Sequence, residues 1–385
     1  MNVRIARKDD LEQIKNIWKY CFNDPDGFFN YYFQNKYKEE NTLVVENEEE
    51  IISSLQMNQY KIVLNNKVYD TSYIVGVSTL AQARGKGSMR ILMSEALREL
   101  YRRNQLISIL MPIDYRLYRP YGYEHCYDQL EYLIQIETLG NFKISGEFKK
   151  AKIEDVDALI DIYNFSMKDK NGFTVRDKYY FENLFKEIEC ENGHIYLHKS
   201  EEFDGYMIYF LLEDKIFVRE IFYKNIQTLK SFLKFIYNHN TQFKNVSITT
   251  PIDDKIKCII SNLKDIEIKI KPFMMGRIIN FEEFIKTLDL DKINCNLKLK
   301  IEDNFIDENN KTFNIDICNG KVQINKTDKE YDIKIDINTL SQLAFSYSTT
   351  KEAVFLGKIC YKDTKYLDML EDIFNIKVNY INEYV

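Results

Sequence analysis

A short glycine-rich stretch carries the clearest chemical signal in the sequence. Residues 82–87 read Gln-Ala-Arg-Gly-Lys-Gly, and an amphipathic helical pattern follows at once from Ser88. The first amide groups of a helix have no partner within it, and the helix dipole favours an anion there. Glycines let the backbone approach phosphate oxygens closely, and Arg84 and Lys86 add positive charge. The local pattern therefore indicates either a phosphate site or a plain helix start with two surface cations.

Other residue types with catalytic or metal-binding chemistry do not cluster in the sequence. The seven cysteines are scattered, form no C-x-x-C motif and do not cluster with the four histidines, so neither a disulfide framework nor a metal site is expected. His125 could serve as a general base, but no partner is evident beside it, and we favour its interpretation as a strand histidine. We therefore expect a protein without a bound metal.

The overall charge and hydropathy narrow the classes of function. The formal net charge is −6 and there is no dense basic run, which argues against nucleic-acid binding and suits a cationic substrate better. The N-terminus lacks the apolar core of a signal peptide, and no apolar run is long enough to span a membrane. We expect a cytoplasmic protein that uses neither nucleic acid nor a membrane as partner.

The elements that would position the glycine-rich stretch can be predicted from periodicity. Asp9 or Asp10 can cap a helix whose apolar face contains Leu11, Ile14, Ile17 and Trp18. Strands are predicted before the stretch, with a hairpin turn at Asn65-Asn66, over residues 42–47, 51–59 and 60–80. After it we expect a helix to about Gln105, a strand over 106–111 and a long strand over 126–136 that closes the unit.

A second copy of this pattern starts near residue 150. Residues 5–18 align with residues 150–163, and Tyr31-Tyr32-Phe33 recurs as Tyr179-Tyr180-Phe181, so both matches are separated by about 145 residues. The shared separation predicts an internal duplication. In the second copy the strands lead into a helix over 225–238 without a glycine, so this copy is not expected to bind the same ligand.

The pattern changes again after residue 281. Apolar residues alternate on both sides of Asn319-Gly320, a strong hairpin signal, and a helix is predicted over 339–347. Alternation at Ile376 and Val378 predicts a last strand that anchors the tail. We therefore expect three domains, over residues 1–140, 141–280 and 281–385.

The loop and the order of elements resemble the GNAT superfamily of N-acetyltransferases. Gln82 to Gly87 match the acyl-CoA motif Arg/Gln-x-x-Gly-x-Gly/Ala of that superfamily. Residues 118–123 are similar to a Tyr-x-x-Phe/Tyr-Gly-Tyr run in the enhanced intracellular survival protein group. This resemblance implies a mixed α+β chain with two acetyltransferase domains, each with a mostly antiparallel central sheet. The second domain lacks the CoA loop, and a sterol-carrier-protein-like α+β domain follows it.

The resemblance also implies which residues bind acetyl-CoA and catalyse. The loop amides would hold the CoA pyrophosphate, whether Gln82 or Arg84 leads the motif, and the preceding strand would pair with the pantetheine arm. The implied residues are Val77, Ser78, Thr79, Gln82, Arg84, Gly85, Lys86, Gly87, Ser88 and Met89. Tyr118 matches the general acid of the group, and the C-terminal carboxylate, here of Val385, matches its base. The group often ends in an aromatic residue, and Val385 departs from that pattern.

For the acceptor, the resemblance implies an acidic pocket. Asp24 matches an acidic position of the group and Glu383 lies beside the terminus, although both are equally compatible with solvated loop charges. Phe33 or a neighbouring aromatic residue would line the pocket. No residue is expected to bind a metal.

The implied function is acetyl-CoA-dependent N-acetylation by direct transfer in a ternary complex. The acceptor would be a primary amine of an aminoglycoside- or polyamine-like cation, or a lysine-like group. Two alternatives stay open: a non-enzymatic ligand-binding or assembly protein that uses the C-terminal domain, and an acyltransferase with a different donor. Members of the group form hexamers, so the resemblance also implies a homo-oligomer.

Overall fold

The first part of the chain contains the predicted helix, hairpin, loop and strand in that order. The computed structural model describes residues 1–291 and 293–384. The strands of this part are β1 (Asn2–Ile5), β2 (Thr42–Asn47), β3 (Glu50–Leu64), β4 (Lys67–Thr79), β5 (Ile107–Leu110) and β6 (Glu124–Gln135). Its helices are α1 (Leu11–Cys21), α2 (Asp26–Asn35), α3 (Ser88–Arg102) and α4 (Tyr115–Tyr118).

The second part repeats this order, which confirms the predicted duplication. Its strands are β7 (Glu147–Lys150), β8 (Phe173–Thr174), β9 (His194–Lys199), β10 (Phe203–Leu211), β11 (Lys215–Tyr223), β12 (Asn245–Thr250) and β13 (Ile266–Ile278). Its helices are α5 (Val156–Met167), α6 (Lys178–Cys190) and α7 (Ile226–Tyr237). The two copies share a local hydrogen bond: Asp10 and Asp155 each accept one from the backbone N–H three residues earlier.

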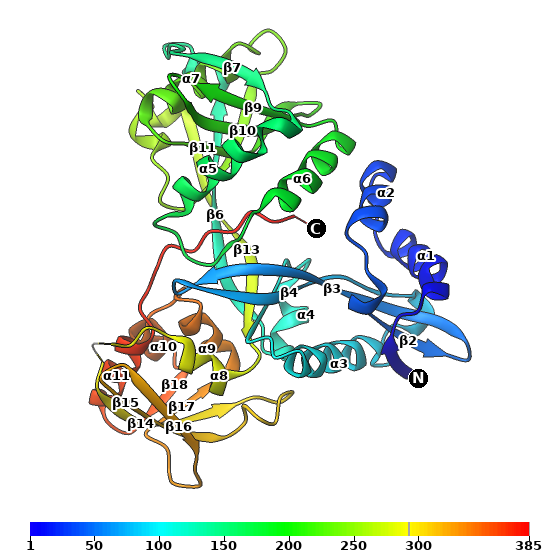
Figure 1. Ribbon diagram of the computed structural model, residues 1–385, viewed down its shortest axis with the longest axis vertical. Coiled ribbons are helices and arrows are strands. Elements are labelled where there is room, and N and C mark those ends of the chain that lie inside the picture. The colour runs from blue at the N-terminus through cyan, green and yellow to red at the C-terminus, as the bar shows by residue number, and fades with distance from the viewer. Residues whose placement is uncertain (292, 385) are drawn as a thin grey trace.

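The strands of both parts join in one sheet (Figure 1). The strand order is β1-β2-β3-β4-β5-β13-β6-β12-β11-β10-β9-β7, and β8 pairs with β3. Neighbours are antiparallel except for the β4–β5 and β11–β12 pairs, which confirms the expected mostly antiparallel character.

The last strands of the two parts exchange places. The sequence predicted that β6 would close the first unit, but β5 pairs with β13, from Met275↔Leu110 to Ile278↔Ile107. β6 pairs with β13 on one side and with β12 on the other. This crossing leaves every strand at the junction paired on both sides, so no edge is exposed there.

The third part confirms the predicted small sheet with helices. Its strands, in the order β16-β15-β14-β17-β18, are β16 (Lys321–Lys326), β15 (Thr312–Cys318), β14 (Cys295–Glu302), β17 (Ile333–Asp336) and β18 (Ile359–Tyr361). Its helices are α8 (Phe281–Thr287), α9 (Ile337–Ala344), α10 (Thr350–Phe355) and α11 (Thr364–Ile373). Asn319 and Gly320 both have positive φ, as the predicted hairpin turn requires.

A buried ion pair joins the third part to the exchanged strand. Arg277 on β13 and Asp303 after β14 are both fully buried, and the guanidinium donates to the carboxylate at 2.9 and 2.8 Å. The same guanidinium donates to the main-chain oxygen of Tyr121. Arg277 therefore connects all three parts of the chain.

The C-terminal tail returns from α11 to the junction of the first two parts (Figure 1). The last strand expected at Ile376 and Val378 does not form. In the described tail, Asn379 forms an isolated bridge with Asn171, the Lys377 N–H donates to the main-chain oxygen of Ser346, and Ile376 is exposed. The Asn379 amide instead donates to the main-chain oxygens of Cys126 and Phe345, which holds the tail without a strand partner.

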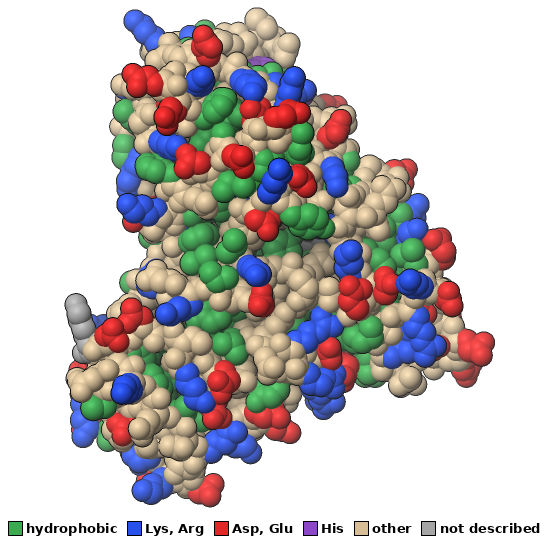
Figure 2. Space-filling model, viewed as in Figure 1, with side chains coloured by type: hydrophobic (Ala, Val, Ile, Leu, Met, Phe, Trp, Pro, Cys, Tyr) green, Lys and Arg blue, Asp and Glu red, His purple; other side chains and the backbone are tan. Residues whose placement is uncertain are grey.

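On the face shown in Figure 2, positive and negative side chains are interspersed over all three parts. Among the described residues, no helix is long and apolar enough to cross a membrane. Within the same residues, no group of three or more His, Cys, Asp or Glu side chains is arranged to hold a metal ion.

Candidate active site

Strand β4 opens a gap in the sheet at its C-terminal end. Its pairing with β5 ends at Ile74↔Leu110, whereas its pairing with β3 continues to Thr79. The register shifts between Ser54 and Gln56, and Gly76 adopts φ +57° at this bulge. A Cβ on Gly76 would overlap the side chains of Gln56 and Trp18, so the bulge requires glycine. Beyond Ile74, one edge of β4 therefore faces an opening instead of a strand.

The glycine-rich loop connects β4 to α3 and presents free amides. Gly85 and Gly87 have φ values of +74° and +86°, and a Cβ on either would have no atom within 4 Å. Within the described chain, the amides of Gly85, Lys86 and Gly87 donate no backbone hydrogen bond. Open space, unpaired donors and a helix N-terminus together fit a pyrophosphate.

The other predicted loop residues surround these amides. Gln82, Arg84 and Lys86 are exposed, and the Arg84 Nε donates to the main-chain oxygen of Thr79 at 3.1 Å. Ser88 is buried and Met89 half-buried at the start of α3. Val77 lines the opening, while Ser78 and Thr79 are tied to β3 through the hydroxyls of Ser54 and Ser53.

A cavity of about 690 Å³ continues from the gap in β4 to the second part of the chain. On the first side it is largely apolar, and its lining there includes Trp18, Phe22, Phe28, Val75, Val77 and Met111. On the second side it reaches α6, β10 and β11, through residues that include Glu187, Cys190, Glu191, Phe210 and Arg219. Tyr384 of the tail completes the lining, so three distant segments of the chain form one site.

Tyr118 lies at the end of the short helix α4 and lines this cavity. Asp114 caps the helix by accepting a hydrogen bond from the Arg116 backbone N–H. The Tyr118 side chain is only 6% exposed, and burial raises the pKa of its phenol to about 12. The phenol is therefore protonated at neutral pH and can donate a proton or a hydrogen bond into the cavity.

Three carboxylates and one guanidinium give the cavity its charge. Asp24 accepts a hydrogen bond from the Trp18 indole N–H at 2.8 Å. Glu187 accepts one from Arg219 at 2.7 Å. Glu191 contacts the solvent of the cavity, yet desolvation by the cavity walls raises the pKa of its carboxyl. The negative charges of Glu187 and Asp24 also raise the pKa of Glu191, whereas the positive charge of Arg219 lowers it. The four charged groups of the cavity therefore lie close enough to influence one another.

Three sequence candidates lie elsewhere, and a fourth is not among the described residues. Phe33 packs against Trp18 and Phe29 behind the wall and is not among the described residues that line the cavity. Glu383 is buried and paired with Arg176, so its carboxylate does not face an acceptor. His125 lies on β6, as expected, but it pairs with Asp128 at 3.0 Å in a separate cleft. Val385 lies outside the described residues.

Sequence reasoning missed the contribution of the second part to the site. Glu187, Glu191 and Arg219 belong to the copy without a glycine loop, and no motif marks them. The available signal was the duplication, which equates α6 with α2. The two helices lie side by side (Figure 1). The Tyr31 hydroxyl donates to the main-chain oxygen of Asn183 at 3.1 Å. In the first copy, α2 follows the cavity residue Asp24. Its counterpart in the second copy, α6, thus reaches the same cavity.

Comparison with protein families assigns each part of the chain. A family model described as an acetyltransferase (GNAT) domain matches residues 2–126, and a second GNAT domain model matches residues 172–278. A sterol carrier protein domain model matches residues 281–382. A search of curated proteins finds no significant match.

Solved structures from several bacteria share the fold over the whole chain. A conserved protein of Enterococcus faecalis V583, described as a probable N-acyltransferase, is 20% identical with a TM-score of 0.89, over 100% of this chain and 99% of its own. A GCN5-related N-acetyltransferase of Anabaena variabilis is 20% identical with a TM-score of 0.87, over 100% of both chains. Eis1 from Mycobacterium abscessus is 13% identical with a TM-score of 0.78, also over 100% of both.

The chain is therefore a GNAT acetyltransferase. It carries two domains of this family followed by a sterol carrier protein domain, in the order that the resemblance implied. The fold and the family implied by the glycine loop and the Tyr118 segment are thus confirmed.

Proposed function

We propose that this acetyltransferase transfers the acetyl group of acetyl-CoA directly to a primary amine of a cationic acceptor. The acceptor is an aminoglycoside- or polyamine-like small molecule, or a lysine-like group. The observation that carries the proposal is the shared cavity, which joins the gap in β4 and Tyr118 to the carboxylates of Asp24, Glu187 and Glu191.

In this proposal the donor is held by the glycine loop and the opened strand. The amides of Gly85 to Gly87 hold the pyrophosphate, Arg84 and Lys86 add positive charge, and the free edge of β4 near Val77 pairs with the pantetheine arm. Acetyl-CoA supplies the activated acetyl group. The loop and strand position that group next to the acceptor, which removes most of the entropic cost of a two-substrate reaction.

The reaction needs a neutral amine and an acid for the leaving sulfur. The amine nitrogen forms a bond to the thioester carbonyl carbon, the carbon–sulfur bond breaks, and the Tyr118 phenol gives its proton to the departing sulfur. We propose that the base that takes the proton from the amine is the C-terminal carboxylate of Val385, as the resemblance implied. Its neighbour Tyr384 lines the cavity, which supports this assignment.

The acceptor side favours a cation. Asp24 and Glu191 add negative charge to the cavity, while Glu187 is already paired with Arg219. A carboxylate in a partly desolvated site attracts an ammonium group more strongly than it does in water. The free-amine form needed for attack is then a minor species that the base must generate.

A screen of acetyl-CoA consumption tests this function. Aminoglycosides, polyamines and lysine peptides should be acetylated, and neutral amines of similar size should react more slowly. Glu191→Gln should lower kcat/KM about fivefold for polycations, because one charge contact contributes about 1 kcal/mol. At high salt the decrease should be smaller, because salt screens this contact. Glu189→Gln, two residues earlier at the end of α6 and not among the described residues that line the cavity, is the matched control.

The screen has two contrary outcomes. Absence of turnover with every amine would refute the proposed function. Turnover that needs a longer acyl-CoA would replace the acetyl donor with another one, while the loop would keep its role.

We also propose that the protein is a cytoplasmic homo-oligomer, with six copies by resemblance to the group. Phe355 and Leu356, at the end of α10, are 90% and 61% exposed, and an interface between copies would cover such side chains. The molecular mass in solution, measured by light scattering, tests the number of copies.

A further inference from the structure

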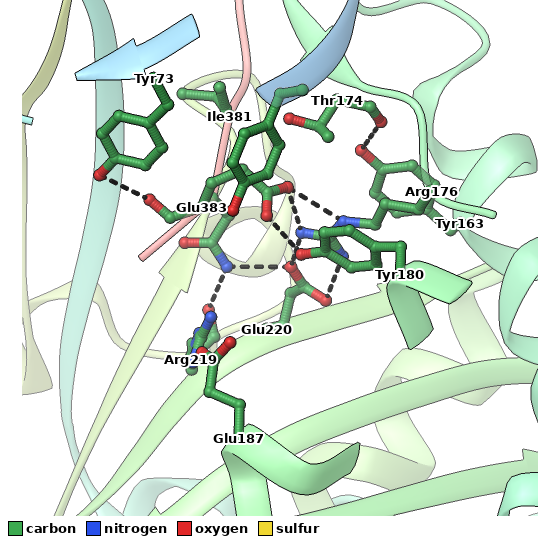
Figure 3. A network of polar contacts seen from close by, with 12 residues as sticks. Tyr73, Tyr163, Thr174, Arg176, Tyr180, Glu187, Arg219, Glu220, Ile381 and Glu383 are labelled. Carbon is green, nitrogen blue, oxygen red and sulfur yellow. Dashed lines mark hydrogen bonds and ion pairs between the residues drawn. The ribbon is translucent and has the colours of Figure 1, made fainter. Parts of the chain in front are cut away.

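A cluster of charged side chains is buried where the C-terminal tail meets the second acetyltransferase domain (Figure 3). Arg176 lies between β8 and α6, Glu220 on β11, and Glu383 on the tail. The three side chains are only 1%, 2% and 3% exposed. The cluster lies outside the set of residues that line the cavity, so the proposed reaction gives it no direct role.

Arg176 is the centre of the cluster. Its two terminal nitrogens donate to the two oxygens of Glu220 at 2.9 and 2.8 Å. Its Nε and one terminal nitrogen donate to Glu383 at 3.1 and 3.0 Å. The rings of Tyr163 and Tyr180 lie 4.3 and 4.8 Å from the guanidinium carbon. The cation therefore binds one carboxylate of its own domain and one of the tail.

The remaining bonds of the cluster also join the tail to its surroundings. The Tyr180 hydroxyl donates to the second oxygen of Glu383. Asn382 donates to Glu220 and to the main-chain oxygen of Arg219, both at 3.0 Å. Gln129 on β6 donates to the Asn382 side chain at 2.9 Å. Residues Ile381 to Glu383 are thus held by side chains from both acetyltransferase domains.

The charges are paired closely enough to stay ionised. Burial alone raises the pKa of Glu220, but the ion pair with Arg176 outweighs it, so the net shift of this pKa is downward. Removing one partner from a buried ion pair leaves an uncompensated charge, whereas an apolar replacement of the whole cluster is often neutral or stabilising. Such a cluster contributes more to a single defined position of the tail than to overall stability.

The residue after Glu383 connects the cluster to the active-site cavity. Tyr384 lines the cavity, and its ring lies 4.5 Å from the guanidinium carbon of Arg219, which in turn pairs with Glu187. A tail that left the cluster would remove this wall and expose Arg219. The position of Glu383 therefore determines the shape of the acceptor side of the cavity.

We propose that the second acetyltransferase domain, which lacks the glycine loop, acts as the receptor for the C-terminal tail. Arg176 is its positioning residue: it holds Glu383, so that Tyr384 completes the acceptor side of the cavity in the first domain. This inference rests on the proposed function for its effect on catalysis. The docking of the tail itself does not depend on that function.

The variant Glu383→Ala tests the inference without unbalancing the domain. It removes the side-chain carboxylate of Glu383 but leaves the Arg176–Glu220 pair intact, so the second domain should stay folded. Hydrogen exchange of residues 378–384, read by mass spectrometry, should accelerate at least about tenfold. With the amine that the screen identifies, kcat should fall about 10- to 100-fold, because the acceptor side is no longer in place. The Kd of acetyl-CoA should change less than about twofold.

Two further variants separate positioning from general stability. Glu383→Gln keeps the oxygen that accepts from Arg176, so it should recover part of both the protection and the kcat. Asp155→Ala removes another buried, ion-paired carboxylate of the same domain, far from the tail in sequence and not part of the cluster. This variant should lower the Tm, but it should change neither the hydrogen exchange of residues 378–384 nor kcat.

The outcomes distinguish the inference from the proposed function. If exchange of residues 378–384 is unchanged in Glu383→Ala, or if kcat persists with the tail released, the inference is overturned. If exchange accelerates but the wild-type chain acetylates no amine, the docking of the tail stands and the proposed function fails.

Discussion

At the scale of single residues, burial sets the chemistry of the cavity. Tyr118 is nearly enclosed, so its phenol keeps its proton far above neutral pH and suits the role of an acid. Desolvation by the cavity walls raises the pKa of Glu191, and the charges of Glu187 and Asp24 act in the same direction, so this group holds a proton more readily than an isolated carboxyl. In the proposed reaction Tyr118 donates a proton, while Asp24 and the ionised form of Glu191 attract the cation.

Tyr118→Phe should lower kcat by about 10²-fold, because the leaving sulfur loses its proton donor. Steady-state kinetics with saturating acetyl-CoA measures this effect. Tyr121→Phe, a buried tyrosine of the same turn that does not line the cavity, should keep most of the activity.

The pH dependence of Tyr118 follows from its raised pKa. The acid form is present below a pKa of about 12 and is lost as the pH rises through that value. The wild-type kcat should therefore show no loss due to Tyr118 up to about pH 10. A loss near pH 8 to 9 that disappears in Tyr118→Phe would contradict the assignment.

At the scale of elements, the donor site depends on how β4 ends and how α3 begins. Gly76 allows the bulge that separates β4 from β5, and Gly87 directly precedes α3 in a left-handed conformation. These are backbone effects. They can be disturbed without touching any catalytic side chain.

Gly87→Val should raise the KM for acetyl-CoA at least about tenfold, because a branched side chain would fill the open space above the loop and strain its φ. Isothermal titration with CoA measures the binding directly. Gly357→Val is the matched control: Gly357 has φ +70° and equally open surroundings, but it lies in the third domain. Both variants should lose about 1–2 kcal/mol of stability from the left-handed residue, and equal CoA binding by both would remove the loop from the donor site.

At the scale of the whole molecule, the three domains are linked through the exchanged strand β13. It completes the sheet of the first domain next to β5, and its Arg277 binds both Asp303 of the third domain and the main-chain oxygen of Tyr121. The turn after Tyr118 is thus held by a residue from the second domain and a carboxylate from the third. Through Asp303 the third domain therefore contacts the residue that holds this turn, in addition to its tail residue Tyr384, which lines the cavity.

Asp303→Asn should lower the free energy of unfolding by about 3 kcal/mol or more, because Arg277 is left as an unpaired buried charge. Urea denaturation of the full chain measures the change. The double variant Asp303→Asn/Arg277→Met removes both charges and should recover a large part of the loss. A single variant that costs no more than an exposed ion pair would contradict this role for Arg277.

Local structure was predictable from the sequence, because it depends on residues close together in the chain. Periodicity and turn chemistry predicted β2 at its observed bounds, the Asn65-Asn66 and Asn319-Gly320 turns, and the loop before α3. The duplication was also visible, because repeated residues need no knowledge of their contacts. The residues of the glycine loop could therefore be named as site candidates in advance.

Only the tertiary structure decided which distant segments meet. Local patterns predict that β6 and β13 are strands, but they do not show that β13, far away in the sequence, pairs with β5 in place of β6. Likewise, an isolated Glu383 reads as a solvated charge, but Arg176, far away in the sequence, binds it in the interior. Pairing and burial depend on contacts between residues more than a hundred positions apart, and those contacts, not the local pattern, bring Glu187, Glu191 and Tyr384 to the cavity of Tyr118.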